Sequence, residues 1–258
     1  AAVTALSGLP ATSRISNIYL AHTVNLSHLS LPRLLAAFPR LVTLTLASSK
    51  SASETSLLRS MNSLKNLGSF KLDECQLSDA IMRAIAENLS QLHTLSLRGN
   101  CALTDNGLFS IASSSYNTGK TLNVLNLSAC RGLTNRGMEH LGLFIGLQVL
   151  DITDVDTKKV TLPINLTKQQ IKFELQDAFR ALRALTHLKL TNINENTASN
   201  LVQNIAGVWV PTLRRVELVR DGYTRDYIVT DMYTQVQESV FIIDDAFVKR
   251  FEELYGRR

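Results

Sequence analysis

The sequence is poor in cysteine, proline and aromatic residues, and it has no long apolar run. Its 258 residues include 3 cysteines, 5 prolines and 1 tryptophan, and aromatic residues make up 6%. No apolar stretch reaches the roughly 18 residues that a membrane-spanning helix requires. The cysteines have neither CxxC spacing nor terminal clusters, which argues against zinc binding and against the disulfide caps of secreted repeat proteins. These absences indicate an intracellular compartment that keeps thiols reduced.

The motifs of the common enzyme classes are also missing. The sequence contains no GxSxG, HExxH, P-loop or GxGxxG motif. Its 5 histidines are scattered along the chain, and none has another metal ligand at a suitable spacing. We therefore expect no catalysis, no cofactor, no metal and no small-molecule substrate.

Leucine, in contrast, is abundant and recurs in a pattern that is clearest in LNVLNLSACRGLTNRGMEHL at 122–141. Leu125 and Leu127 are two residues apart, so they point to the same face of a short strand. Cys130 follows at a position where an inward side chain can pair with backbone groups of a buried turn. Thr134 can then cap a helix. The segment therefore predicts a unit of strand, turn and helix.

The same unit recurs eight times along the chain. The starts of successive units are 26, 26, 25, 30, 25, 38 and 28 residues apart, and a leucine-rich repeat has about 20–29 residues. The predicted strands lie at 15–20, 41–46, 67–72, 92–97, 122–127, 147–152, 185–190 and 213–218. Helices are expected at 28–38, 54–65, 79–89, 105–114, 135–144, 168–184 and 195–206.

These units resemble the leucine-rich-repeat superfamily and, more narrowly, its cysteine-containing class of F-box and ribonuclease-inhibitor-like proteins. Cys75, Asn100 and Cys130 occupy the position that such repeats give to Asn or Cys. The resemblance implies a right-handed α/β solenoid, a horseshoe of about eight repeats with parallel strands on its concave face and helices on its convex face. The outer repeats depart from the pattern, with other residues at that position: Thr23, Ser49, Val155, Ile193 and Asp221.

The pattern divides the chain into a lead-in or cap at 1–14, repeats at 15–218 and a C-terminal cap at 219–258. The interval of 38 residues carries an insertion near 155–170, which is either part of a binding face or a tolerated surface loop. Within the cap, YIVT and SVFII have strand propensity and can pair as a hairpin. Asp244 can begin a last helix, whose aromatic stripe either closes the solenoid or docks on another subunit.

Residues that alternate with the inward leucines are expected to line the concave face. They are small and mostly neutral in the first half of the chain and charged in the second half. Charged side chains set specificity at protein interfaces, and arginine and aromatic residues often anchor them. Asp151 and His187 would lie on adjacent strands, where they can form an ion pair. We predict partner contacts at Tyr19, Lys71, Asp73, Arg98, Asp151, His187, Lys189, Arg215 and Glu217.

Positive charge is concentrated in the first third of the chain. The net charge is +5, and residues 1–72 contain seven Lys or Arg against one acid, Glu54. This excess can be a solvated convex face, a dock for an acidic partner or a contact for RNA phosphates. The aromatic residues that stack bases are missing from it. The candidate contacts for an anionic partner are Arg14, Arg33, Arg40, Lys50, Arg59 and Lys65.

We therefore expect a non-enzymatic scaffold for protein–protein interaction, most simply a structural subunit of a larger intracellular assembly. The basic first third and the absence of a starting Met keep a mitochondrial or ribonucleoprotein assembly open. One alternative is the substrate-recognition domain of an F-box ubiquitin-ligase receptor, which requires an F-box upstream of Ala1. Another is direct RNA contact through the basic third.

Overall fold

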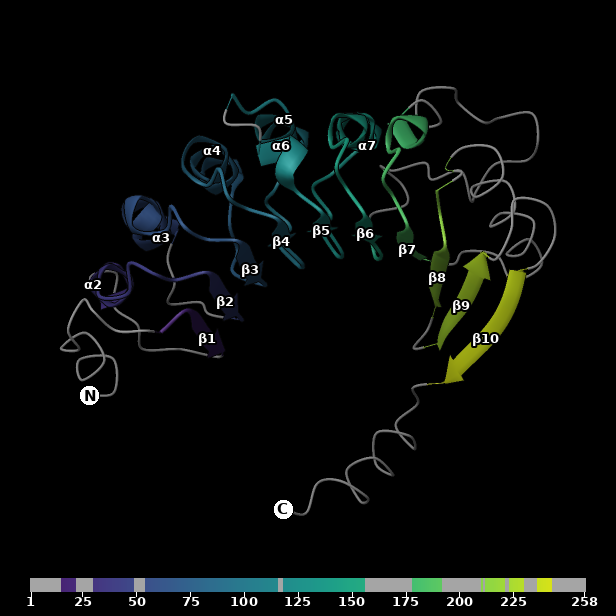
Figure 1. Cartoon of the computed structure of the whole chain (residues 1–258), viewed down its shortest axis with the longest axis horizontal. Coiled ribbons are helices and arrows are strands. Elements are labelled where there is room, and N and C mark those ends of the chain that lie inside the picture. Colours follow the sequence, from purple (N-terminus) through teal and green to yellow (C-terminus); the bar gives the residue numbers. More distant parts are fainter. Residues whose placement is uncertain are drawn as a thin grey trace, which may run out of the picture.

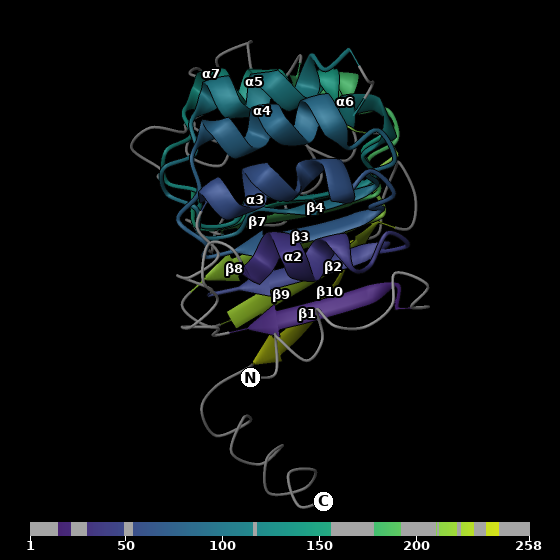
Figure 2. The ribbon, with the colours of Figure 1, turned by 90° about the vertical axis from the view of Figure 1, so that its left-hand side faces the viewer.

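The described residues form one curved, ten-stranded sheet with helices along its outer side (Figure 1). Strands β1 to β8 are parallel and follow one another in chain order, and β9 and β10 are added antiparallel. Seen from the end, the helices form a second layer over the sheet (Figure 2). The computed structural model describes residues 15–21, 30–48, 54–115, 118–155, 178–191, 210, 212–220, 223–229 and 236–242.

The elements alternate as strand and helix over most of the described chain. The strands are β1 (Asn17–Ala21), β2 (Thr43–Ala47), β3 (Ser69–Asp73), β4 (Thr94–Ser96), β5 (Val124–Asn126), β6 (Val149–Ile152), β7 (His187–Thr191), β8 (Arg215–Arg220), β9 (Tyr223–Val229) and β10 (Val236–Ile242). The helices are α2 (Ser30–Ala36), α3 (Glu54–Ser60), α4 (Asp79–Asn88), α5 (Asp105–Ala112), α6 (Thr118–Thr121) and α7 (Asn135–His140), with short 3-10 turns η1 (Met61–Ser63) and η2 (Leu141–Leu143).

The repeating leucines form the core because the parallel register stacks equivalent residues of successive strands. Each member of one such row is 0–1% exposed, so the row is shielded from water along its length. Burial of this kind contributes about 1.5–3 kcal/mol per large aliphatic side chain. The row contains Leu44, Phe70, Leu95, Leu125, Leu150, Leu188 and Val216.

All eight predicted repeat strands are confirmed, and so is the C-terminal hairpin, which is formed by β9 and β10. The five helices expected before residue 145 are present with shorter ends, since 61–63 and 141–143 are 3-10 turns. The short helix α6 was not predicted, and it accounts for the longer interval of 30 residues before β5. The predicted lead-in, most of the 155–170 insertion, the 195–206 helix and the last helix fall outside the described residues.

Asn100 ties two neighbouring repeats together inside the solenoid. Its side chain is fully buried, and its Oδ1 accepts the backbone N–H groups of Cys75 and Leu77, both at 3.1 Å. Its Nδ2 donates to the carbonyl oxygens of Leu72 at 2.6 Å and Leu97 at 2.8 Å. Buried backbone groups that lose such partners are costly. The predicted role of the Asn position is therefore confirmed at this residue.

The two cysteines at the equivalent positions are also buried, and each can make only weaker contacts through sulfur. Cys130 Sγ lies 3.1 Å from the carbonyl oxygen of Leu97, and Cys75 Sγ lies 3.3 Å from that of Asp73. Burial raises the pKa of the Cys130 thiol to about 12, so this thiol stays protonated near neutral pH.

A second set of contacts joins the starts of successive helices. The carboxylate of Asp79, in the first turn of α4, accepts the backbone N–H of Thr104 at 2.8 Å and its hydroxyl at 2.5 Å. One repeat later, Asp105 accepts the N–H and hydroxyl of Thr134 at the same distances. Gly137 leaves the space that this carboxylate fills, because an added Cβ would overlap Asp105 Oδ1. Each helix cap is thereby positioned by the repeat before it.

Candidate functional site

One row of side chains crosses the concave face at a single level of the sheet. Cα pairing places Tyr19, Thr45, Lys71, Ser96, Asn126, Asp151, Lys189 and Glu217 next to one another in this order. The β1–β3 end carries the strongly exposed Tyr19, at 70%, and Lys71. The β6–β8 end carries consecutive charges of alternating sign.

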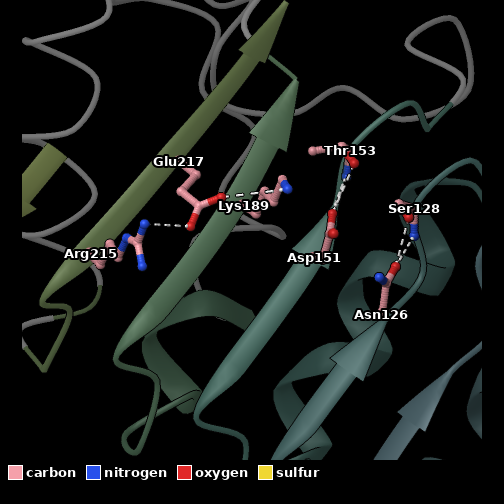
Figure 3. Close-up of polar contacts among 7 residues, drawn as sticks. All are labelled: Asn126, Ser128, Asp151, Thr153, Lys189, Arg215 and Glu217. Carbon is pink, nitrogen blue, oxygen red and sulfur yellow. Dashed lines mark hydrogen bonds and ion pairs between the residues drawn. The ribbon is translucent and has the colours of Figure 1, made fainter. Parts of the chain in front are cut away.

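Three of the charges at this end, which lie on β7 and β8, form a connected cluster (Figure 3). Glu217 binds two cations at once, with Oε1 at 3.2 Å from Arg215 Nη2 and Oε2 at 3.5 Å from Lys189 Nζ. All three side chains are between one quarter and one half exposed. Ion pairs with this much solvent contact contribute only about 0–1 kcal/mol to the stability of a fold. Their main effect is on the charge pattern that a partner meets.

Asn126 and Asp151 occupy equivalent positions on β5 and β6 and make equivalent local contacts. Asn126 Oδ1 accepts the N–H of Ser128 at 2.8 Å and its hydroxyl at 2.7 Å. Asp151 Oδ1 accepts the N–H of Thr153 at 3.1 Å and its hydroxyl at 2.9 Å. Both side chains are held in place in this way (Figure 3), and Asp151 adds a negative charge where Asn126 is neutral.

The charged cluster, Asn126 and Asp151 line a hollow of about 350 Å³ on the concave face of β5–β8. Five of the nine predicted contacts meet there, namely Asp151, His187, Lys189, Arg215 and Glu217. With His187 neutral, two carboxylates face two cations, so the hollow has no net charge. The prediction omitted its neutral lining residues, although the same two-residue alternation points them to the concave face: Val124, Asn126 and Val149.

Two of the four predicted contacts outside the hollow, Arg98 and Asp73, differ from expectation, and so does the pairing of His187 within it. Arg98 is exposed, but β4 ends at Ser96, so Arg98 belongs to the following turn and not to the strand. Asp73 is half-buried and accepts the hydroxyl of Ser96 at 2.5 Å, so part of its acceptor capacity is already used. His187 Nδ1 lies 2.9 Å from Thr186 Oγ1, and no ion pair links His187 to Asp151 in the described chain.

The chain path is similar to that of proteins of known structure. The leucine-rich-repeat-containing protein LegL7 from Legionella pneumophila is 17% identical with a TM-score of 0.51, and the match covers 99% of this chain and 76% of LegL7. The chain is a leucine-rich-repeat solenoid. A chain from the complex of Rad7 and Elc1 in yeast matches at 17% identity with a TM-score of 0.41. This match covers 87% of the present chain and 67% of the matched chain. At 17% identity, the similarity to LegL7 concerns the solenoid fold alone, and no protein-family model matches.

Within the described residues, no group of three or more His, Cys, Asp or Glu side chains could hold a metal ion. Cys75 and Cys130 are buried, and only Cys101 is exposed. None of the described helices is both long enough and apolar enough to cross a bilayer.

The described candidate contacts for an anionic partner lie on the helix side of the first repeats. Arg33 and Arg59 are exposed on α2 and α3, while Arg40 and Lys65 are exposed in the turns that lead from these helices to β2 and β3. These four therefore lie on the helix side of the repeats and not on the sheet. Two further candidates, Arg14 and Lys50, fall outside the described residues.

Proposed function

We propose that this solenoid is a non-enzymatic protein-binding domain that receives a partner in the concave hollow of β5–β8, as a structural subunit of a larger assembly. The observation that supports this most is the convergence of Asp151, Lys189, Arg215 and Glu217 in one half-exposed hollow. Such a pattern favours one partner over another through complementary charge more than through raw affinity.

The hollow also offers a surface for close packing. Val124 and Val149 lie one alternation before Asn126 and Asp151 on the same face, so apolar and charged lining residues are adjacent. Protein interfaces combine such an apolar centre with polar groups that fix the orientation. Tyr19, at the far end of the concave face, is a second anchor if the partner spans the whole sheet.

Affinity purification of the tagged chain from its native cells, read by mass spectrometry, tests this function. The double variant Lys189→Glu with Glu217→Lys keeps the composition but reverses the local charge pattern. We expect it to lose the partners that the unchanged chain recovers. Arg136→Glu with Glu139→Arg makes the same exchange on the exposed side of α7 and should keep them. Equal recovery with all three chains would contradict the proposal.

The same purification separates the more specific roles. A stoichiometric set of organelle or ribosomal subunits would support a mitochondrial or ribonucleoprotein assembly, and its loss after nuclease treatment would point to RNA. Cullin-ligase components would support the alternative of an F-box receptor. The cysteine-containing class, which suggested that alternative, stays a prediction from Cys75, Asn100 and Cys130.

A further inference from the structure

Four exposed cations form a group on α2, α3 and the turns that follow these helices. The group consists of Arg33, Arg40, Arg59 and Lys65. None of the four forms an ion pair with an acid among the described residues. This sets the group apart from the concave hollow, where each cation of the cluster is already paired with Glu217.

The repeat places these cations in register. Arg33 and Arg59 are separated by 26 residues, the same interval as that between the first two repeat starts, and each comes directly before a pair of buried residues. They therefore hold equivalent positions on neighbouring helices, whose axes in packed proteins are about 8–10 Å apart. The two turns are joined directly, since Asn66 Nδ2 donates to the carbonyl oxygen of Pro39 at 3.0 Å. Arg40 and Lys65 thus belong to adjacent turns.

Negative charge near the group is already committed elsewhere. Glu54 is the only acid in residues 1–72. It is half-buried, and its Oε1 accepts the N–H of Ser78 at 3.0 Å and the Ser78 hydroxyl at 2.7 Å. Salt screens exposed charges over about 8 Å under physiological conditions, which is close to the spacing of neighbouring helices, so these cations repel one another only weakly. An anionic partner would relieve this repulsion.

We propose that this group, the α2–α3 basic surface, is a second docking site that takes an extended acidic segment of a partner protein. An extended segment in the polyproline II conformation has three residues per turn and rises about 3.1 Å per residue, so its carboxylates three residues apart share one face and span about 9 Å. This span matches the spacing of neighbouring helices. Leu58, which precedes Arg59 in the sequence and is 37% exposed, offers an additional apolar contact on α3.

An acidic protein segment fits better than RNA because the described part of this surface has no exposed aromatic side chain on which bases can stack. The exposed large apolar residues of this region are Leu58 and Val42, and neither is aromatic. Proteins that bind single-stranded RNA combine a basic groove with aromatic side chains.

Fluorescence anisotropy with two labelled probes, a dodecapeptide of glutamate and a 12-nucleotide uridylate RNA, tests the proposal. Arg33→Glu with Arg59→Glu should weaken glutamate binding by about tenfold or more, because two favourable contacts become repulsive. Lys120→Glu with Arg136→Glu changes the net charge equally at exposed positions on α6 and α7 and should change binding by less than about twofold. Arg33→Lys with Arg59→Lys should retain most of the affinity.

Three results would overturn the proposal: equal weakening by the control variant, tighter binding of RNA with the same dependence on Arg33 and Arg59, or no saturable binding of the glutamate peptide. Circular dichroism melting of every variant establishes that the fold is retained. If the charge-reversed variant melts early, Arg33→Gln with Arg59→Gln replaces it, with an expected loss of about threefold or more. The Lys189 and Glu217 exchange should leave glutamate binding unchanged, so this test is separate from that of the concave hollow.

Discussion

The polar groups in the buried turns and those in the concave hollow are similar in kind but differ in what surrounds them. Asn100 is fully buried, and its four shortest contacts fix backbone groups of two repeats. Glu217 is a quarter exposed, and its contacts are to side chains that remain in touch with solvent. Burial thus makes the first group necessary for the fold, whereas solvent leaves the second group available for a partner. The comparison predicts that substitutions will affect stability in the buried turns and binding in the concave hollow.

Asn100→Ala should have the largest effect. It leaves the N–H groups of Cys75 and Leu77 and two carbonyl oxygens without their partner inside the core. We expect the free energy of unfolding, measured with urea, to fall by about 3–5 kcal/mol. Asn126→Ala removes an amide from the concave face and should cost about 1 kcal/mol or less. Similar losses of unfolding free energy at Asn100 and Asn126 would contradict the distinction between the buried turns and the concave hollow.

Cys130 should make stability depend on alkaline pH. The pKa of its thiol is raised from 9.0 to about 12 by burial. The thiol therefore contributes stability that is present below pH 9 and is lost as the pH rises from about 9 to 12, because the unfolded state releases the proton first. Between pH 8 and pH 10, the free energy of unfolding should fall by about 1 kcal/mol more for the unchanged chain than for the Cys130→Ala variant. Parallel pH profiles for the two chains would contradict this assignment.

Asp105→Ala should have an intermediate effect on stability. It removes the carboxylate that accepts both the N–H and the hydroxyl of Thr134 at the start of α7. We expect a loss of about 1–2 kcal/mol in the free energy of unfolding. If the contact is responsible, the double variant with Thr134→Ala should lose less than the sum of the two single variants. Strict additivity would show that the contact between repeats contributes nothing.

Glu217→Gln should separate binding from stability. Its partners Lys189 and Arg215 are partly solvated, so unfolding should change by less than about 1 kcal/mol. Recovery of the concave-face partner in purification should nevertheless fall clearly, since two cations lose their counter-charge. A large loss of stability with unchanged recovery would assign Glu217 to the fold.

Ala129→Gly should give the smallest effect, a gain in stability. Ala129 has φ of 56°, a left-handed conformation that costs an L-residue about 1–2 kcal/mol. Gly99 holds the equivalent place one repeat earlier, with φ of 72°. We expect Ala129→Gly to raise the free energy of unfolding by about 0.5 kcal/mol, since glycine's greater freedom when unfolded offsets part of the relief. A decrease in the melting temperature would contradict this.

Much of the candidate site could be predicted because side-chain direction in a strand alternates with sequence. That rule alone places Asp151, Lys189 and Glu217 on the concave face. It failed where the strand was shorter than the pattern, as for Arg98 beyond the end of β4. It also cannot say which of several neighbouring charges will pair, so the expected contact between Asp151 and His187 was replaced by contacts with Thr153 and Thr186.

The sequence by itself determined the repeat, the strands and the buried leucines, because these follow from residue spacing within a single unit. It also determined the role of Asn100, since asparagine is the side chain that best hydrogen-bonds the backbone groups of such a buried turn. Only the tertiary structure decided that Glu217 binds Lys189 and Arg215 together, that Asp105 holds the cap residue of the next helix, and that the basic residues of α2 and α3 lie in register. Each of those outcomes includes groups about 25–30 residues apart, which become neighbours only when the repeats stack.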